Sequence, residues 1–438
     1  MNTVTVVGAG LAGSECAWQL ARRGVQVDLR EMKPDKRTPA HVTDDFAELC
    51  CSNSLRSDQL SNAVGLLKEE LRQLGSLILE CADATRVEAG GALAVDRHGF
   101  SALVTERIRA HPNITVTPGE VTEIPAGEVV IASGPLTSDA LSDALRDLLG
   151  DTTALSFYDA SAPLVSAASV DMSRAWFGSR YDRGTADYIN CPMTEEEYDA
   201  FRDALSTAQE ADVHGFEDKK VFEGCMPVEV MARRGRDTLA YGPLKPRGLR
   251  DPRTGREPFA VVQLRRDNAE GSVYNLVGFQ THLKFPEQKR VFSMIPALRD
   301  AEFLRYGVMH RNTFLDSPRL LDRYYRLKQE PRISFAGQMT GVEGYVESAA
   351  SGFLVGVETA RRLHGLSPVD FPRETAIGAL ACYISNQSVT VFQPMNINFG
   401  IMPPLEQRVR GKRNKNEAIS RRSLELISAI RAELSPDV

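Results

Sequence analysis

The sequence predicts an α/β protein in which one domain is built from both ends of the chain and a smaller α+β domain is inserted between them. The N-terminal stretch "TVTVVGAGLAGSECAWQLARRGVQVDLRE" has the pattern of a strand, a glycine turn, a helix and a second strand. Residues 333–363 show a similar order, with a strand, a Gly-rich turn and a helix. Between them the strands shorten and prolines and exposed charges increase, which is typical of a separate domain. We expect boundaries at 1–155, 156–304 and 305–438.

The composition is that of an ordinary soluble globular protein. Hydrophobic residues make up 42% and charged residues 25% of the 438 positions. The N-terminus lacks a signal-peptide pattern, and no apolar run approaches the roughly 20 residues of a membrane span. We therefore expect a cytoplasmic protein with no membrane partner. The net charge of −6 argues weakly against a nucleic-acid partner, unless basic residues cluster.

The glycine turn carries the strongest local signal. Gly8 makes the tight turn after the first strand, Gly10 lets the backbone approach a pyrophosphate, and Gly13 lets the helix lie close to the sheet. An acidic residue about 20 positions further on accepts hydrogen bonds from a ribose. A glycine turn in an unrelated α/β domain is the alternative. The predicted dinucleotide-binding residues are Gly8, Ala9, Gly10, Leu11, Ala12, Gly13 and Glu31.

Two later segments favour FAD over NAD as the resident dinucleotide. Residues 127–138 form a strand that runs into a small-residue turn at Gly134, and residues 333–363 contain Gly337, Gly344, Tyr345 and a helix rich in small residues. Two-part FAD-binding domains use such segments beside the flavin, although ordinary core packing also explains the helix. The chain holds one complete phosphate fingerprint, so NADH or NADPH would visit without a domain of its own. The sequence therefore predicts a Rossmann-like two-part FAD-binding domain.

The cysteines indicate chemistry rather than cross-links. Their number, seven, is odd and no C-x-x-C pair occurs, so we expect neither a disulfide framework nor a zinc site, and no bound metal. Cys50 and Cys51 lie in the polar loop "AELCCSNSLRSD" after the second strand. A partly exposed thiol among polar groups ionises readily, but a passive loop cysteine explains this stretch equally well.

A second candidate thiol, Cys225, lies in the basic stretch "KKVFEGCMPVEVMARRGR". Cationic neighbours lower the pKa of a thiol and attract polyanions. The basic run continues to residue 256, and another occupies residues 408–422. Charge runs are usually solvated surface, but two of them on an acidic protein favour contacts with a phosphate backbone. The predicted RNA-binding residues are Arg233, Arg234, Lys245, Arg247, Lys412 and Arg413.

Aromatic rings and histidines recur in "GFQTHLKFPEQKR" and "YGVMHRNTFLDSP". Near a flavin, such rings could stack on a second flat ring. A packed core aromatic or a satisfied histidine is the commoner explanation for any one of them.

Several separate motifs together resemble one family. They are "VVGAGLAGSE", "FAELCCSNSL", "GGALAVDRHGFS", "NCPMTEEEY", "PFAVVQLR", "VGFQTHLKFPEQKR", "YGVMHRNT", "GVEGYVESAASG" and "FQPMNINFGIMPP". The chain resembles, over nearly its whole length, the bacterial folate- and FAD-dependent tRNA (uracil-5-)-methyltransferases, the TrmFO family. The GidA-like flavoproteins are more distant relatives with a longer C-terminal part.

The resemblance implies C5 methylation of a T-loop uridine in tRNA, with methylenetetrahydrofolate as carbon donor and FAD, reduced by NADH or NADPH, as the source of electrons. The two functional cysteines of the family correspond to Cys51 and Cys225. We expect Cys225 to add to C6 of the uracil, because it lies in the basic segment. Cys51 is expected near the flavin, in proton transfer or auxiliary thiol chemistry, and Cys50 leaves that assignment open. The target base must flip out of its loop.

Three alternatives remain from the sequence. The first is a GidA-like enzyme that modifies a wobble uridine, and the second is a flavin thiol oxidoreductase that uses Cys50 and Cys51, although adjacent cysteines form a strained disulfide. The third is a tRNA-binding chaperone that keeps FAD as a relic. No obligatory protein partner is expected.

Overall fold

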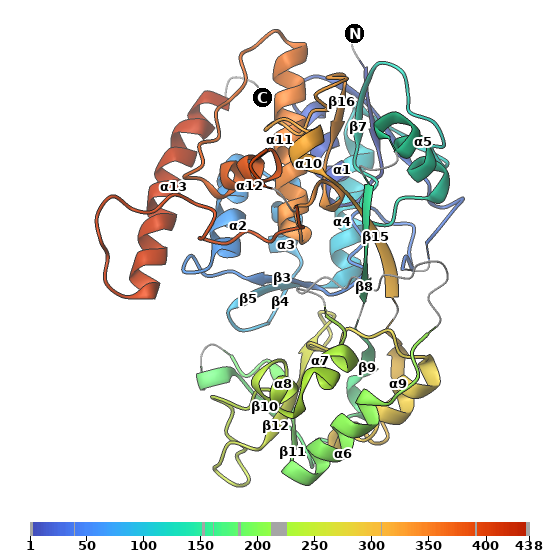
Figure 1. Ribbon diagram of the computed structural model, residues 1–438, viewed down its shortest axis with the longest axis vertical. Helices are drawn as coiled ribbons and strands as arrows, with labels where there is room; N and C mark the ends of the chain where they lie inside the picture. The colour runs from blue at the N-terminus through green and yellow to red at the C-terminus, as the bar shows by residue number, and fades with distance from the viewer. Residues whose placement is uncertain are drawn as a thin grey trace.

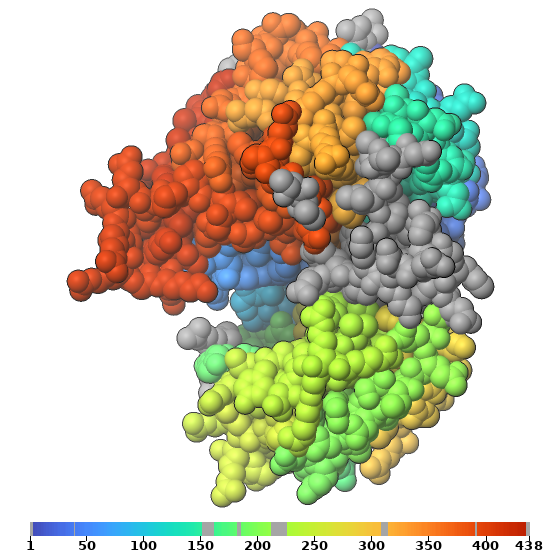
Figure 2. Space-filling view, viewed as in Figure 1, coloured from blue at the N-terminus to red at the C-terminus, as the bar shows by residue number. Residues whose placement is uncertain are grey.

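The computed structural model describes residues 3–38, 40–150, 154–160, 162–182, 185–211, 226–307, 309–389 and 392–434. They form two lobes (Figure 1), of which the larger contains both ends of the chain and the smaller is formed by the middle of the chain. Figure 2 shows the same division on the surface, with the yellow-green middle of the chain in a lobe of its own.

A parallel sheet forms the centre of the larger lobe. Its strand order is β16-β7-β1-β2-β6, so the strand that begins at Ile333 pairs directly with a strand from the first third of the chain. The interior residues of β1 and β7 are buried, as expected for a parallel sheet covered on both faces. The predicted two-part α/β domain is thereby confirmed. The strands are β1 Thr3–Val7, β2 Gln26–Glu31, β6 Ile114–Pro118, β7 Glu128–Ile131 and β16 Ile333–Phe335.

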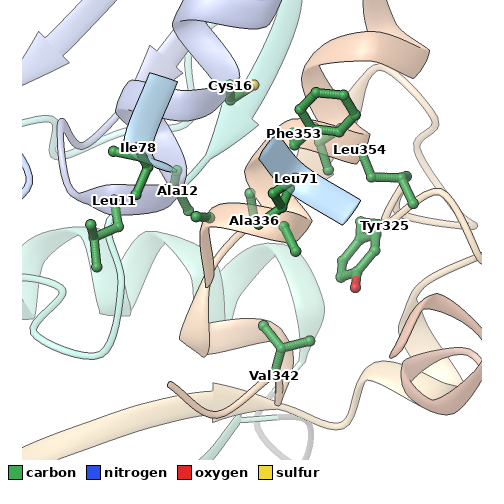
Figure 3. Packing of buried hydrophobic residues seen from close by; sticks show 14 of the residues in the cluster. Leu11, Ala12, Cys16, Leu71, Ile78, Tyr325, Ala336, Val342, Phe353 and Leu354 are labelled. Atoms are coloured by element: carbon green, nitrogen blue, oxygen red, sulfur yellow. The ribbon is translucent and has the colours of Figure 1, made fainter. Parts of the chain in front are cut away.

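Helices α1 and α11 cross at small residues beside this sheet. A Cβ atom on Gly352 of α11 would lie 2.1 Å from the carbonyl oxygen of Ala12 in α1, so this approach requires glycine. Figure 3 shows the apolar core around the crossing, with Cys16 from α1 and Phe353 from α11. The helices of the larger lobe are α1 Leu11–Ala21, α2 Ala63–Leu74, α3 Leu77–Ala84, α4 Arg97–Ala110, α5 Asp139–Leu149, α10 Ser317–Leu320, α11 Tyr345–Leu363, α12 Ala376–Ile384 and α13 Lys412–Leu434.

The smaller lobe has an antiparallel sheet and a core of its own, whose buried residues run from Ala162 to Ala301. Helix α6 begins with a capping box, in which the side chains of Thr194 and Glu197 each accept a hydrogen bond from the other residue's backbone N–H. The sheet order is β10-β11-β12-β13-β9-β14. The elements are β9 Leu164–Ser166, β10 Trp176–Gly178, β11 Tyr188–Met193, β12 Ala260–Arg266, β13 Val273–Leu276, β14 Phe303–Arg305, α6 Glu195–Ser206, α7 Val228–Arg234, α8 Arg236–Tyr241 and α9 Phe285–Phe292.

An antiparallel pair of strands, β8 (Ala154–Ala160) and β15 (Met309–Leu315), joins the two lobes. A further small sheet, β3-β5-β4, lies in the larger lobe, with bounds Ser54–Ser57, Ala92–Val95 and Arg86–Val87. The sequence did not predict β3 or the helices α2 and α3. Strand β6 ends at a proline, which cannot donate to a ladder, and a glycine with φ of +121° follows it.

Candidate functional site

The turn between β1 and α1 is closed by backbone contacts that only glycine permits. Gly8 has a φ of +96°, and its N–H donates to the carbonyl of Arg30 at 2.7 Å. A Cβ atom on Gly13 would lie 1.8 Å from the carbonyl oxygen of Gly8. A Cβ atom on Gly10 would meet no atom within 4 Å. Gly10 therefore faces open space at the N-terminus of α1, where unpaired N–H groups attract an anion.

The carboxylate of Glu31 supports this turn. One of its oxygens accepts a hydrogen bond from the N–H of Ala9 at 2.7 Å, and the other accepts from the N–H of Lys33 at 3.1 Å. Each carboxylate oxygen has a second lone pair, so Glu31 retains the capacity to accept from a ribose hydroxyl. The side chain thus holds the turn in place in addition to its predicted role.

Two cavities meet over the glycine turn. The first has an empty volume of about 640 Å³ and is lined by the turn, by Glu31 and by the segment that follows β7. The second, of about 790 Å³, extends from the turn to the start of α11. They form one elongated cleft, because they share the lining residues Gly10, His41, Glu48, Ser133 and Leu136.

Most of the predicted cofactor-binding residues lie along this cleft. Its first part is lined by Gly8, Ala9, Gly10 and Glu31, and its second part by Gly10, Leu11, Ala12, Gly134, Gly337 and Tyr345. Gly13 instead packs against the turn, and a Cβ atom on Gly344 would lie 2.5 Å from a carboxylate oxygen of Glu347. Gly344 therefore serves the backbone at the start of α11, where its φ is +113°.

Both members of the cysteine pair line the second cavity. The N–H groups of Cys51 and Ser52 donate to the phenolic oxygen of Tyr345 at 2.9 and 3.3 Å, which ties the cysteine loop to α11. Burial, with a smaller contribution from Glu48, raises the pKa of Cys50 to about 11. Cys50 therefore remains a neutral thiol near pH 7, which argues against a redox or nucleophilic role for it.

The cysteine loop is also held by arginines from both lobes. Arg305 of β14 donates to the carbonyl of Cys50 at 3.2 Å. Arg97, at the start of α4, contacts the carbonyl of Leu49 and forms a buried ion pair with Asp267 of the smaller lobe at 2.8 Å. Neither arginine was predicted, because nothing in the local sequence marks it as a partner of a loop that lies 48 positions from Arg97 and 255 from Arg305.

Asn53 adds a further link between the lobes. Its side-chain amide donates to the carbonyls of Val95 and Arg266, each at 2.9 Å, and its oxygen accepts from Arg265 at 3.2 Å. Since Asn53 is fully buried, these bonds satisfy an amide that would otherwise destabilise the fold. The loop that carries Cys51 is thus fixed relative to the smaller lobe.

The other predicted thiol, Cys225, lies outside the described residues. The chain that follows it is well anchored: the N–H of Val228 donates to the carbonyl of Gln280 at 2.8 Å, and buried Glu229 accepts from the hydroxyl of Thr281 at 2.9 Å. The imidazole of His282 lies between Glu229, at 3.0 Å, and Glu210, at 2.9 Å. His282 is therefore an internal histidine between two carboxylates, although its Nδ1 atom is buried without a hydrogen bond of good geometry.

The predicted RNA-binding cations differ in their surroundings. Arg233 is paired with Glu210, and Arg413 is paired with Glu417 at 2.8 Å. Arg247 is 73% exposed, with Glu257 at 4.0 Å from its guanidinium. The side chains of Arg234, Lys245 and Lys412 are exposed as well. In Figure 1 the α13 helix and the α8 segment lie toward the same side of the two lobes.

Within the described ranges, no group of histidine, cysteine and acidic side chains is arranged to hold a metal ion. In the same part of the chain, no helix combines the length and the apolar character needed to cross a membrane.

Comparisons with known proteins agree with this geometry. A family profile described as "Glucose inhibited division protein A" matches residues 3–367. A methylenetetrahydrofolate–tRNA-(uracil-5-)-methyltransferase TrmFO of Heliobacterium modesticaldum is 61% identical over 432 residues, 98% of each chain, and a TrmFO of Enterococcus faecalis is 57% identical over 97% of each chain. The chain belongs to the TrmFO group of the GidA family. The resemblance inferred from the motifs is thereby confirmed.

A solved structure supports the fold of this TrmFO-group protein. The structure of Aquifex aeolicus GidA matches with a TM-score of 0.71 at 16% sequence identity, over 98% of this chain and 74% of that chain. At this identity the match supports the fold alone.

Proposed function

We propose that this chain transfers a one-carbon unit from methylenetetrahydrofolate to C5 of a T-loop uridine in tRNA, in the cytoplasm, with bound FAD and with NADH or NADPH as reductant. The observation that carries the proposal is the position of Cys51 in the same cleft as the glycine turn, in a chain of the TrmFO group. A thiol and a dinucleotide site that share one cleft suit a reaction that needs both a sulfur group and electrons.

The cleft fits FAD. Gly10 leaves the open space that a pyrophosphate requires, and Glu31 has lone pairs left for a ribose. The second cavity, beside Tyr345 and the start of α11, would take the flavin ring. Bound there, FAD would supply the electrons that convert a methylene group on uracil into a methyl group. The residues that would hold it are Gly8, Ala9, Gly10, Leu11, Ala12, Glu31, Gly134, Gly337 and Tyr345.

The thiols perform the nucleophilic part of the reaction. The Cys225 thiolate adds to C6 of the uracil, the C5=C6 electrons move to give an enolate, and C5 forms a bond to the methylene carbon of the folate. A base then removes the C5 proton, and the folate nitrogen leaves to give an exocyclic methylene on C5. Once that methylene has been reduced to a methyl group, the sulfur leaves C6 and the C5=C6 double bond is restored. Cys51, whose loop is held by Tyr345, is our candidate for the proton transfer or for an auxiliary thiol step.

The exposed cations bind the phosphate backbone of the tRNA. Lys245 and Arg247 on the smaller lobe and Lys412 on the larger lobe are the members of the predicted set with the most accessible charge. Arg233 and Arg413 already have acidic partners, so they would gain less from a phosphate. Each substitution that removes a phosphate-binding cation should lower the salt dependence of tRNA binding by about one ion.

The test is a transfer experiment with the FAD-loaded protein, unmodified tRNA, labelled methylenetetrahydrofolate and NADH or NADPH. We expect label in 5-methyluridine, abolished by Cys225→Ser and strongly reduced by Cys51→Ser. Cys50→Ser is the matched control and should keep most of the activity, because the high pKa of Cys50 already keeps its sulfur protonated. Oxidation of the nicotinamide without labelled tRNA would instead support a thiol oxidoreductase, and label in a wobble uridine would support GidA-like chemistry.

A further inference from the structure

A ladder of aromatic rings runs from the core of the smaller lobe to its surface. Phe279 and Phe292 are fully buried, with ring centroids 5.3 Å apart, and Phe303 lies 6.3 Å beyond Phe292. Tyr306 follows at 5.7 Å from Phe303, with 13° between the ring planes. Phe285 stacks on Tyr306 at 5.2 Å and 18°, and is 51% exposed. The outermost ring thus has one face on Tyr306 and half of its surface open to solvent.

The outer rings are held rigidly. Pro286 follows Phe285 in the first turn of α9, where its fixed φ suits the helix start. Gln288, which is fully buried, donates to the carbonyl of Gly307 at 2.7 Å and accepts from the N–H of Gly307 at 2.8 Å. This pair of bonds fixes the backbone directly after Tyr306. An exposed ring that is already ordered loses little entropy when a ligand stacks on it.

One ring of the ladder is adjacent in sequence to a residue that holds the cysteine loop, and cations flank Phe285. Arg305, which precedes Tyr306, donates to the carbonyl of Cys50. Lys284 and Lys289, on either side of Phe285 in sequence, are exposed. Glu287 is the nearest acid in sequence, and its charge is paired with Arg290 at 2.8 Å.

We infer that the open face of Phe285 is a stacking site for an unpaired base of the tRNA, with Lys284 and Lys289 contacting the adjacent phosphates. Single-stranded nucleic acid is bound by this combination of an exposed aromatic ring and nearby cations. A protein partner with an apolar surface would have to desolvate the two lysines, which makes it a poorer match. The inference rests on the proposed tRNA substrate and gives it a contact that neither the cysteines nor the glycine turn provides.

The experiment compares tRNA binding by Phe285→Ala, Phe285→Trp and wild-type protein over a range of salt concentrations. Loss of one stacked base weakens binding by about 5- to 150-fold. The slope of log K against log salt should not change, because no charge is removed, whereas Lys284→Ala should lower it. The Phe285→Trp variant keeps an aromatic ring, so it should bind tRNA with about the affinity of wild type. Phe177→Ala is the matched control, since Phe177 is 52% exposed on β10 of the same lobe, and it should bind like wild type.

Phe285→Leu keeps an apolar side chain, so it tests the ring even if the alanine variant is unstable, and it should also lose affinity. Equal tRNA affinity of the leucine variant and wild type would overturn the inference. So would a rise in the KM for methylenetetrahydrofolate with unchanged tRNA affinity, or a change in oligomeric state. Because binding is measured without turnover, failure of the stacking site is distinguishable from failure of the methyl-transfer proposal.

Discussion

Gly10→Ala should separate cofactor binding from protein stability. The backbone at Gly10 has φ of −70° and ψ of −170°, which alanine adopts without strain, and its new Cβ atom would have no protein neighbour within 4 Å. The free energy of unfolding of the cofactor-free protein should therefore stay within about 1 kcal/mol of wild type. The same methyl group would occupy the space proposed for the pyrophosphate, and an overpacked contact costs about 1–3 kcal/mol. FAD affinity should fall by about 5- to 150-fold.

Gly352→Ala is the opposing control. Its Cβ atom would lie 2.1 Å from the carbonyl oxygen of Ala12, so α1 and α11 must separate and the cofactor-free protein itself should lose about 1–3 kcal/mol or more. The assays are FAD titration followed by flavin fluorescence, and urea unfolding of the cofactor-free proteins. If Gly10→Ala binds FAD as tightly as wild type, the pyrophosphate does not lie over this turn and the reasoning is refuted.

Three further predictions concern the supports of the site. Burial alone would lower the pKa of His282, but its ion pairs more than offset this effect and raise the pKa. The contribution of His282 to the free energy of unfolding is therefore present below the unfolded pKa of about 6.5 and is lost as pH rises through the folded value, by at most about 1.4 kcal/mol per pH unit. Urea unfolding of His282→Gln should show a flatter pH profile. Arg97→Ala leaves Asp267 buried without its partner and should lower the free energy of unfolding by about 3–5 kcal/mol, measured by urea titration. Tyr345→Phe leaves two N–H groups without an acceptor, costs about 1–3 kcal/mol locally, and should speed labelling of the cysteine pair by a thiol reagent.

Each of these results has a clear opposite. A His282→Gln variant whose pH profile parallels that of wild type would show that the histidine is not charged in the fold. If replacing Arg97 and Asp267 together by Met and Leu is as damaging as Arg97→Ala, the loss comes from packing rather than from an unpaired charge. Unchanged labelling rates in Tyr345→Phe would show that the phenol does not order the loop.

Local sequence was sufficient for the elements that carry the nucleotide site. Gly8 and Gly13 are required by contacts within their own turn, so their spacing alone predicted it. The cap of α6 was equally local, because Thr194 and Glu197 are three residues apart. Most of the predicted glycines and Cys51 were placed in the cleft, whereas Arg97, Arg305 and Asn53 were missed.

Local patterns in the chain were enough to predict the two-part α/β domain, the glycine turn and the candidate thiol, because these depend on backbone geometry and chemistry within a few residues of one another. The packing of distant elements alone revealed that Tyr345 holds Cys51 across 294 positions of chain, and that a ladder of rings ends at the half-exposed Phe285. Contacts between distant residues depend on how separate elements pack, and packing preferences leave no local pattern. For that reason the reactive loop was predictable, and the groups that hold it in place were not.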